Sequence, residues 1–589
     1  MSQGPPCGSE GDGPSCRPED TFAREQAIGL GPHSGGNEQN QGAARIEPDA
    51  GAVRRQQITD CELAATEREF SSVTRVLAAL LEGLKIHESR GDLQIPVTGL
   101  AYDSRKIQAG NVFVALCGAH LDGSTFIEDA IQRGARAIVT EQPLNGTLPV
   151  SGVRVPDART ALARLARNFY ENPSRDLQLI GVTGTNGKTT TTLLIESILK
   201  QVSSEVGIIG TLGYRWGRNC RSAHMTTPES SDLQRLFWEM KQDRVAHVVM
   251  EVSSHALSLG RVEGCCFDAG VFTNLSQDHL DFHPTMAAYF AAKSLLFKDE
   301  VSRRSPGFVG VINVDDSYGR RLQAEIGGNL WSYSIGDRDA SIWVKAAALE
   351  PSGIQATLAT PMGDLSITSP LLGRLNLYNL LASAATALAM GLPREAVREG
   401  LHAVASVDGR LQRLSLPREL GFEVVVDYAH TPDAMEKALS CLREMTRNRL
   451  LVVFGCGGDR DRAKRPLMGG VGARFADLII LTSDNPRSEE PAAIVREIEP
   501  GVLAAGFTCH AAHTHPPDRK AYTIEVDRRR AIELALSWAQ PGDVVFIGGK
   551  GHETYQIIGD RVLQFDDRVV VHEFLAASRE PFSPRSGKP

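Results

Sequence analysis

The stretch Gly181-Val-Thr-Gly-Thr-Asn-Gly-Lys-Thr-Thr190 follows an apolar run, Leu177 to Val182, and precedes a helical run, Thr191 to Leu199. This order predicts a buried strand, a glycine-rich turn and a helix. Glycines let the backbone point its N–H groups toward phosphate oxygens, and the beginning of the helix adds positive potential. We therefore interpret the stretch as a phosphate-binding loop.

The loop is a variant of the usual P-loop. Strict spacing would place a glycine at residue 182, where this chain has Val182, and the glycine stands at Gly184 instead. Lys188 can still reach the outer phosphates of a nucleotide, and Thr189 can bind Mg²⁺. A plain glycine turn is the alternative interpretation, but the strand-like and helix-like runs on either side favour the phosphate site.

Strand-like apolar runs separated by helix-length segments continue along the chain, which predicts a largely parallel sheet covered on both faces. The runs lie at 177–182, 245–252, 269–273 and 308–314, and in a later block at 423–426, 450–454, 477–481 and 543–547. A smaller first block has a helix-like stretch at 73–86 and strand candidates at 111–116 and 135–139. We expect an α/β fold with three domains, in which the central domain has a P-loop-type, mostly parallel sheet and the C-terminal domain is Rossmann-like.

The expected boundaries follow the changes in pattern. Residues 1–70 are rich in Gly, Ser, Pro and Gln and poor in aromatic residues, so they cannot bury enough apolar area to fold and are predicted to be a disordered extension. The N-terminal domain would then span 71–175, the central domain 176–407 and the C-terminal domain 408–589.

Composition narrows the class of protein. The formal net charge of −8 provides no basic field for a polyanion, so nucleic acid is not an expected partner. The ten cysteines are scattered without a CxxC pair, as in a cytoplasmic enzyme with reduced thiols. There is no signal-like N-terminus and no apolar run of about 18 residues, so no membrane association is expected.

Two strand ends carry candidate metal ligands. Glu251 ends the run 245–252 in Met250-Glu-Val-Ser-Ser-His255, and His279 follows the run 269–273. A carboxylate and an imidazole at neighbouring strand ends suit Mg²⁺ held beside nucleotide phosphates. Each residue alone is more often a capping or solvated side chain, and it is the combination with the phosphate loop that favours the metal site.

Several motifs occur in an order that resembles the successive signatures of the Mur ligase family, from about residue 75 to about residue 575. They are Gly184-Thr-Asn-Gly-Lys-Thr-Thr190, Glu251-Val-Ser-Ser-His255, Thr273-Asn-Leu-Ser-Gln-Asp-His279, Gly373-Arg-Leu-Asn-Leu-Tyr-Asn379, Gly409-Arg410 and Asp427-Tyr-Ala-His-Thr-Pro-Asp433. Three more resemble family members that add meso-diaminopimelate to UDP-N-acetylmuramoyl-L-alanyl-D-glutamate: Cys456-Gly-Gly-Asp-Arg-Asp461, Asp484-Asn-Pro-Arg487 and Gly549-Lys-Gly-His-Glu553.

The resemblance implies an ATP-dependent ligase of cell-wall precursor synthesis. ATP would phosphorylate the γ-carboxylate of the bound D-glutamate, and the amine would attack the resulting acyl phosphate. The implied catalytic residues are Lys188, Glu251, His279 and Lys293. Thr189, Glu251 and His279 would hold Mg²⁺, and Lys293, as a carbamate (N6-carboxylysine), would help hold a second Mg²⁺. The implied ATP-binding residues are Gly184, Thr185, Asn186, Gly187, Lys188, Thr189, Thr190, Asn376, Asn379 and Arg410.

The resemblance also implies a site for the UDP-linked substrate. Its residues would be Ser104 near the uracil and Thr226, Thr227, Ser253 and Arg261 around the sugar, diphosphate and peptide. The chain departs from the family pattern at two positions: Leu259 stands where some relatives have Gln, and Gln412 where Glu usually follows the Gly-Arg motif.

The implied amino-acid pocket contains Arg460, Asp484, Asn485, Pro486, Arg487, Gly549 and Glu553. Meso-diaminopimelate differs from lysine by a second carboxylate on its distal carbon, and the fork of Arg487 could receive it. Bound lysine would leave that guanidinium without a partner, so diaminopimelate is preferred.

Three alternatives remain open: a Mur-type ligase adding L-lysine or another amine, a folate-directed relative, and a non-catalytic scaffold with the same fold. We expect a monomer. The tract Cys509-His-Ala-Ala-His-Thr-His515 groups one thiol with three imidazoles, but its spacing fits no standard zinc site, and we expect a surface loop.

Overall fold

The structure is a computed structural model, and it describes residues 73–118, 121–298, 306–511 and 519–577. The extension predicted at 1–70 lies outside the described residues, as do His513 and His515 of the histidine-rich tract. None of the helices in the described ranges is long and apolar enough to cross a membrane.

The N-terminal part is built on a five-stranded sheet in the order β2-β7-β6-β5-β4, parallel except for the edge strand β2. Its strands are β2 Glu88–Arg90, β4 Gly99–Ala101, β5 Asn111–Val114, β6 Ala137–Thr140 and β7 Ser151–Arg154, beside a pair β1 Arg75–Val76 and β3 Pro96–Val97. Its helices are α2 Leu77–Leu80, α3 Ile127–Gln132 and α4 Ala158–Phe169. The helix expected at 73–86 is wrong in length: only the four residues of α2 are helical, and Gly83 ends the turn with φ +77°.

An eleven-stranded sheet forms the central part, in the order β11-β10-β9-β12-β8-β13-β14-β15-β16-β17-β18. The strands from β9 to β16 in this order are parallel, as expected, whereas β10, β11, β17 and β18 add antiparallel pairs at the two edges. The strands are β8 Gln178–Thr183, β9 Val206–Gly210, β10 Gly213–Trp216, β11 Asn219–Arg221, β12 His247–Glu251, β13 Ala269–Phe272, β14 Val309–Asn313, β15 Leu330–Ser334, β16 Ile342–Glu350, β17 Gly353–Ala359 and β18 Leu365–Ser369.

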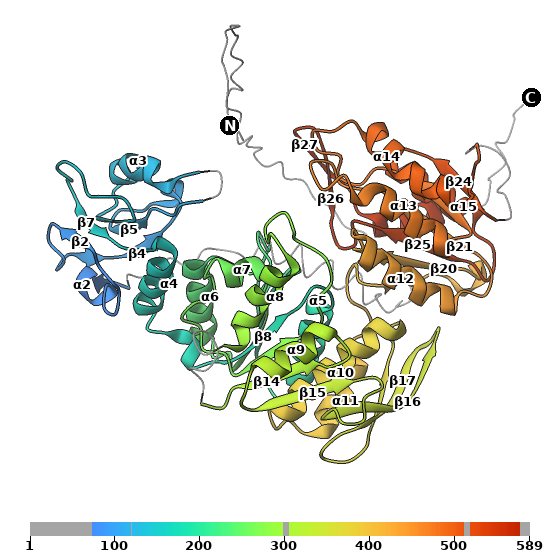
Figure 1. Cartoon of the computed structure of the whole chain (residues 1–589), viewed down its shortest axis with the longest axis horizontal. Helices are drawn as coiled ribbons and strands as arrows, with labels where there is room; N and C mark the ends of the chain where they lie inside the picture. The colour runs from blue at the N-terminus through green and yellow to red at the C-terminus, as the bar shows by residue number, and fades with distance from the viewer. Residues whose placement is uncertain (1–72, 119–120, 299–305, 512–518, 578–589) are drawn as a thin grey trace, which may run out of the picture. The chain divides into compact units, whose positions relative to one another are not determined.

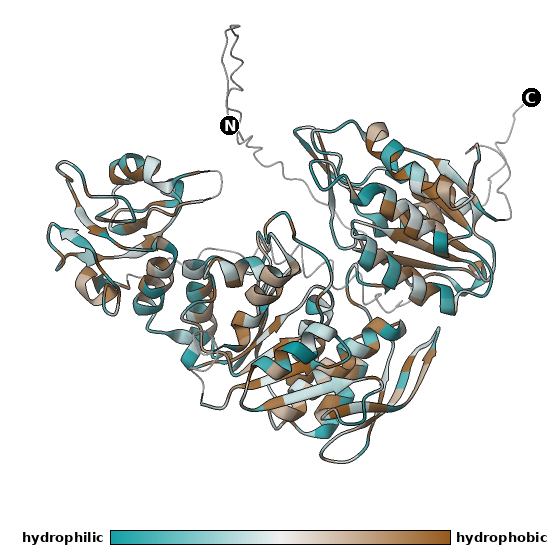
Figure 2. Cartoon of the chain, viewed as in Figure 1, coloured by the Kyte–Doolittle hydropathy of each residue, from teal (hydrophilic) through white to brown (hydrophobic). Residues whose placement is uncertain are grey.

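Helices cover both faces of the central sheet, because alternate strand residues point into two separate apolar cores (Figure 1). On β8, for example, Ile180 packs with α5, α10 and α11, and Leu179 belongs to the core formed with α6 to α9. The helices are α5 Lys188–Leu199, α6 Ser230–Gln242, α7 Ser254–Ser258, α8 Met286–Ser294, α9 Ser317–Glu325, α10 Gly373–Ala389 and α11 Arg394–Ala403. Figure 2 shows the central strands as hydrophobic, which fits their burial on both faces.

The C-terminal part has a seven-stranded sheet in the order β19-β20-β25-β21-β22-β24-β23, parallel except for β19. Its strands are β19 Gln412–Arg413, β20 Glu423–Asp427, β21 Leu450–Phe454, β22 Leu478–Leu481, β23 Thr508–Cys509, β24 Ala521–Ile524 and β25 Val544–Gly548, followed by a hairpin of β26 Tyr555–Ile558 and β27 Arg561–Gln564. Helices α12 Pro432–Met445, α13 Lys464–Phe475 and α14 Pro491–Ala504 cover one face, and α15 Arg528–Trp538 and α16 Asp567–Ala577 cover the other. This doubly wound arrangement confirms the expected α/β class. The domain boundaries themselves stay predictions.

Candidate active site

The predicted phosphate loop lies between β8 and α5, at the carboxyl end of the central sheet. Gly184 has φ +144°, and a Cβ there would lie 1.9 Å from Thr273 Oγ1. A Cβ on Gly187, with φ +87°, would lie 2.4 Å from Asn379 Oδ1. Both positions therefore require glycine for conformation and for space. Lys188 folds back over the loop, and its Nζ donates to the carbonyls of Gly184 at 3.0 Å and Thr185 at 2.9 Å.

The loop is held by residues that follow β13, the neighbouring strand. Thr273 Oγ1 donates to the carbonyl of Asn186 at 2.6 Å. Asn274 accepts from the backbone of Thr185 at 2.8 Å through its carbonyl and from that of Asn186 at 3.0 Å through Oδ1. Sequence reasoning quoted Thr273 and Asn274 in a motif without giving them a role. Because β8 lies between β12 and β13, the residues after both neighbours reach the loop.

Glu251 ends β12 on the other side of the loop and is 2% exposed. Its Oε2 accepts from Thr189 Oγ1 at 3.0 Å, and its Oε1 accepts from the backbone N–H of Thr211 at 2.8 Å. Thr189 and Thr190 are buried in the first turn of α5. The structure thus joins Thr189 to Glu251, two of the residues predicted to bind Mg²⁺.

Lys293 is a buried lysine on α8, only 1% exposed, and its Nζ donates to the carbonyl of Gly184 at 2.8 Å. The ammonium also lies 4.6 Å from the ring centre of Tyr289. Burial, with the nearby charge of Lys188 as a second cause, lowers the pKa of Lys293 well below its ordinary value. Reaction with CO₂ requires a neutral amine, so the site meets that requirement. The alternative of a solvated helix lysine does not fit this burial.

His279 follows β13 with a positive φ of +53°, and its ring lies 4.8 Å from that of His255. Partial burial lowers the pKa of His279 to about 4, although its side chain is 44% exposed, so its imidazole is neutral at pH 7. Within the described residues, no three His, Cys, Asp or Glu side chains gather as a preformed metal cage. The oxygen donors of Thr189 and Glu251 nevertheless suit Mg²⁺, which usually fills its shell with water and phosphate oxygens. His279 would add a nitrogen donor, which is less usual for this ion, and its place in the metal site stays a prediction.

Asn376 and Asn379 lie on α10 beside the phosphate loop, and both are buried. Asn379 accepts from Thr191 Oγ1 at 3.3 Å and donates to Asn376 Oδ1 at 3.0 Å. These contacts hold the beginning of α5, and a direct contact of either asparagine with ATP stays a prediction.

Arg410 belongs to the C-terminal part, where its guanidinium lies 4.7 Å from the ring centre of Tyr428. Its buried Nε has no hydrogen-bond partner among the described residues. Gln412, which replaces the glutamate usual at this position, accepts from the backbone N–H of Gly409 at 2.9 Å. A glutamate oxygen at this position could accept the same hydrogen bond, so the replacement by Gln412 preserves the contact with Gly409.

The residues predicted for the sugar, diphosphate and peptide meet after β12. Thr227 Oγ1 donates to the carbonyl of Glu251 at 2.9 Å and accepts from the backbone N–H of Ser253 at 3.1 Å. Arg261 Nη1 donates to the carbonyl of Thr227 at 3.3 Å. Its Nε donates to the buried carboxylate of Glu229 at 3.1 Å, a contact that sequence reasoning missed.

Thr226 and Ser104 complete that predicted set. Thr226 Oγ1 lies 3.2 Å from Thr211 Oγ1, which places it beside the Glu251 cluster. Ser104 is buried in the N-terminal part, where it begins a 3₁₀ helix, Ser104–Lys106. Leu259 caps α7 and is half-buried.

The predicted amino-acid pocket lies at the carboxyl ends of β21, β22 and β25, which are neighbours in the C-terminal sheet. Asn485 is 4% exposed, and its Nδ2 donates to Glu553 Oε2 at 2.8 Å. A Cβ on Gly549 would lie 2.4 Å from Asp484 Oδ2, so the two loops touch there. Lys550, which is fully buried, donates to Asn485 Oδ1 and to Glu553 Oε2, both at 3.1 Å. Lys550 stood in a quoted motif but was not predicted to join these side chains.

Arg487 takes an unusual backbone conformation with φ +51°. Strand β26 holds it there: the N–H of Arg487 donates to the carbonyl of Ile557 at 3.1 Å, and its carbonyl accepts from Gly559 at 2.7 Å. Its Nη1 donates to the carbonyl of Gly458 at 2.8 Å. Arg487 is half-buried, so the alternative of an exposed loop arginine does not fit.

Two more predicted residues lie in these loops. The carbonyl of Pro486 stands 1.9 Å from where a Cβ on Gly458 would be, so the loops after β21 and β22 approach closely. Arg460 is exposed and donates to the carbonyl of Asp459 at 3.2 Å. Its place in the pocket stays a prediction.

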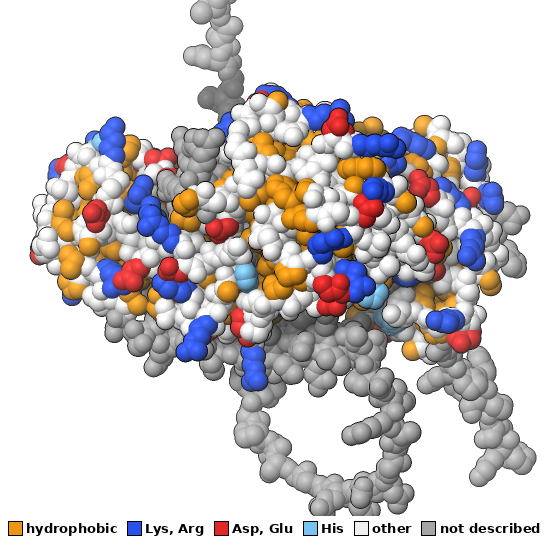
Figure 3. Space-filling model, turned by 90° about the horizontal axis from the view of Figure 1, so that it is seen from below, with side chains coloured by type: hydrophobic (Ala, Val, Ile, Leu, Met, Phe, Trp, Pro, Cys, Tyr) orange, Lys and Arg blue, Asp and Glu red, His pale blue; other side chains and the backbone are white. Residues whose placement is uncertain are grey.

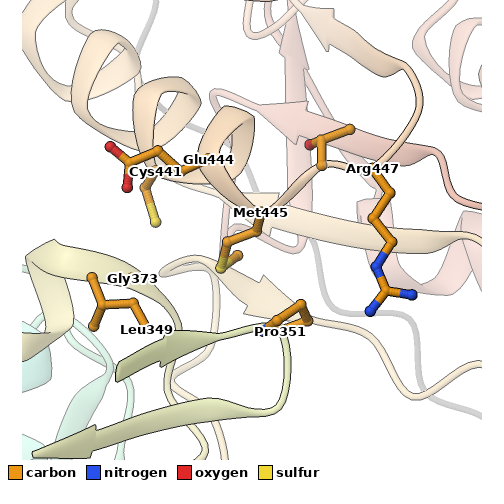
Figure 4. Close-up of a pocket in the computed structure, with 8 residues that line it drawn as sticks. Leu349, Pro351, Gly373, Cys441, Glu444, Met445 and Arg447 are labelled. Atoms are coloured by element: carbon orange, nitrogen blue, oxygen red, sulfur yellow. The ribbon is translucent and has the colours of Figure 1, made fainter. Parts of the chain in front are cut away.

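Two pockets among the described residues lie elsewhere. One, of about 280 Å³, is lined by Gly373, by Cys441, Glu444 and Met445 of α12, and by nearby loop residues (Figure 4). A second, of about 650 Å³, lies along 405–423 and 370–372. Neither includes a predicted site residue. Loops that bind phosphates use backbone N–H groups at strand ends and need no deep cavity in the protein alone. On the face drawn in Figure 3, basic and acidic side chains are interspersed, so any anion is bound locally.

Three family models match successive parts of the chain: the Mur ligase family catalytic domain over 96–170, the Mur ligase middle domain over 182–387, and the Mur ligase glutamate ligase domain over 409–551. A UDP-N-acetylmuramoyl-L-alanyl-D-glutamate–2,6-diaminopimelate ligase of Geobacter metallireducens is 44% identical over 506 residues, 85% of this chain and 98% of the relative. The same-named protein of Gloeobacter violaceus is 46% identical over 494 residues, covering 84% and 96%. A solved structure of a ligase with that name superposes with a TM-score of 0.61 at 32% identity and covers 86% of this chain and all of its own.

Proposed function

The chain belongs to the Mur ligase family, and from this premise we propose how its site works: it is an ATP-dependent ligase that adds meso-diaminopimelate to the D-glutamate of UDP-N-acetylmuramoyl-L-alanyl-D-glutamate. This reaction forms a peptidoglycan precursor. We further propose that the enzyme acts as a monomer in the cytoplasm, without nucleic acid or membrane as a partner.

The first step is phosphoryl transfer. A γ-carboxylate oxygen of the D-glutamate attacks the γ-phosphorus of ATP, ADP leaves, and an acyl phosphate forms. Because the backbone N–H groups of Thr185 and Asn186 already donate to Asn274, the phosphates are held by the backbone N–H groups from Gly187 to Thr189, at the start of α5. The ammonium of Lys188 neutralises the charge that spreads over the transferring group. Asn376, Asn379 and Arg410 complete the nucleotide site in this proposal.

Thr189, Glu251 and His279 would hold one Mg²⁺, and Lys293, as its carbamate, would help hold a second. Bound Mg²⁺ supplies positive charge next to the phosphate oxygens. The support for Lys293 is its burial and its lowered pKa, which favours the neutral amine that CO₂ requires.

In the second step, the amine of diaminopimelate attacks the acyl carbon. The tetrahedral intermediate expels phosphate, and the nitrogen loses a proton. Thr226, Thr227, Ser253 and Arg261 position the UDP-linked substrate, with Ser104 at the uracil. Arg261 is itself oriented by the buried carboxylate of Glu229.

One observation supports the choice of amine more than any other. Arg487 is fixed by β26 at the edge of a pocket whose other members, Asp484, Asn485 and Glu553, can receive the amino and carboxylate groups of an amino acid. A guanidinium fork there matches the distal carboxylate of diaminopimelate, which L-lysine lacks.

Phosphate release tests the proposal. Purified protein is incubated with ATP, Mg²⁺ and the UDP-linked dipeptide, together with meso-diaminopimelate, L-lysine or no amine. Release that depends on diaminopimelate is expected. Release with L-lysine would assign the chain to lysine-adding enzymes, and no release with either amine would favour a scaffold.

A further inference from the structure

A fully buried ion pair lies beneath the amino-acid pocket. Arg528 begins α15 and Asp567 begins α16, and both side chains are 0% exposed. The guanidinium binds the carboxylate with two parallel hydrogen bonds, Nε to Oδ1 at 2.8 Å and Nη2 to Oδ2 at 2.7 Å. Burying two charges costs desolvation energy that their attraction often only offsets, so stability alone is a weak reason for such a pair.

The remaining bonds of Arg528 reach two strand ends. Its Nη1 donates to the carbonyl of Ser483 at 3.3 Å, and its Nη2 donates to that of Gly548 at 3.0 Å. Ser483 follows β22 and immediately precedes Asp484, and Gly548 ends β25 and immediately precedes Gly549. The side chain of Arg528 therefore binds the backbone at the start of both loops of the amino-acid pocket.

The two loops meet beyond these anchors. Asp484 lies against Gly549, and Asn485 is joined to Lys550 and Glu553. Strand β21 lies between β25 and β22 in the sheet, so no backbone ladder joins these two strands directly. Gln556 of β26 also donates to the carbonyl of Asp484 at 2.7 Å, but Arg528 donates to a backbone carbonyl at the start of each of the two loops.

We propose that Arg528, oriented by Asp567, is a positioning residue that sets the spacing of the two loops and thereby the affinity for the incoming amino acid. It touches no reacting atom. The inference rests on the proposed function, because it concerns the same pocket. A shift of about 1 Å in groups that position a substrate can cost on the order of 10²-fold in rate or affinity.

The C-terminal sheet contains a matched control. Arg449 and Asp543 form another buried ion pair, 6% and 0% exposed, with Nη2 to Oδ2 at 2.7 Å. Arg449 precedes β21 and Asp543 precedes β25, so this pair lies at the amino ends of the strands, away from the pocket loops. It also donates to a backbone carbonyl, that of Trp538 at 2.8 Å.

The experiment compares Arg528→Lys with Arg449→Lys. Lysine keeps the charge but cannot make two parallel bonds and two carbonyl contacts at once. Both variants should lower Tm. Arg528→Lys should raise the KM for diaminopimelate roughly 10- to 100-fold while the KM for ATP and for the UDP-linked dipeptide changes less than about twofold. Arg449→Lys should leave all three KM values near those of the wild type.

A double variant, Arg528→Met with Asp567→Leu, covers the case in which Arg528→Lys does not fold, because it removes both charges and leaves neither unpaired. It should show the same selective rise in KM. An unchanged KM for diaminopimelate in a folded Arg528 variant, or an equal rise in the Arg449 variant, overturns the inference. A wild-type enzyme that does not respond to diaminopimelate would instead overturn the proposed function, so the two failures are distinguishable.

Discussion

Replacing Arg487 by glutamine should weaken binding of diaminopimelate without affecting ATP. The guanidinium has five N–H groups, and one hydrogen bond to protein is described, from Nη1 to Gly458. Hydrogen bonds to a charged partner contribute about 1.5–3 kcal/mol. At about 1.4 kcal/mol per tenfold change, the KM for diaminopimelate should rise roughly 10- to 150-fold.

The design of the test follows from the backbone. Arg487 has φ +51°, and glutamine or lysine would adopt that conformation at a cost similar to that of arginine, so folding should change little. Arg487→Lys keeps a point charge without the fork, and its KM should lie between those of the wild type and Arg487→Gln. Arg474→Gln, which removes an exposed arginine of α13 paired with Glu436, is the matched control.

The assay is steady-state phosphate release with diaminopimelate and ATP varied in turn. Discrimination against L-lysine, measured as the ratio of kcat/KM values, should fall in Arg487→Gln because the lost contact serves only the distal carboxylate. Equal changes in the KM for ATP and for diaminopimelate would refute the assignment of Arg487, as would unchanged discrimination.

Three other perturbations follow from the phosphate loop. Gly184→Ala should abolish ATP-dependent turnover, because the added Cβ would stand 1.9 Å from Thr273 Oγ1 and residue 184 has a φ of +144°. The affinity for ATP, measured by titration calorimetry, should fall. An unchanged affinity would contradict the loop geometry. Glu251→Gln should lower kcat at least about tenfold and weaken Mg²⁺ dependence, since an amide loses the negative charge that accepts from Thr189; a Mg²⁺ titration of activity checks this. Lys293→Met should abolish ligation yet raise Tm at pH 7. Folding lowers the pKa of Lys293, so the unfolded chain binds more protons, and the stability of the wild type rises with pH up to the ordinary lysine pKa near 10.5. Thermal scans over that pH range should show that the Tm of the variant rises less steeply with pH than that of the wild type. An equal rise in both proteins would exclude Lys293 as its source.

The sequence was a good guide to the elements that contiguous residues encode. Strands expected at 177–182, 269–273 and 450–454 lie within a residue or two of β8, β13 and β21. Their apolar runs are long enough to fill both faces of a parallel sheet, and the glycines that follow permit only a few backbone conformations. Short or edge elements were less predictable: the helix expected at 73–86 shrinks to four residues, and the antiparallel strands β17 and β18 were not expected, because an edge strand with one solvated face has a weak apolar signal.

By itself, the sequence determined that a glycine-rich turn joins a buried strand to a helix, and it identified candidate side chains for a phosphate site. Only the tertiary structure decided which of them meet. Thr273 donates a hydrogen bond to Asn186, 87 residues earlier in the chain, and Arg528 donates one to Ser483, 45 residues earlier. Those contacts depend on the order of strands in each sheet, with β8 between β12 and β13 and β21 between β25 and β22. Strand order arises from the packing of the whole domain. The apolar periodicity of one segment does not indicate which strands will pair with it in the sheet.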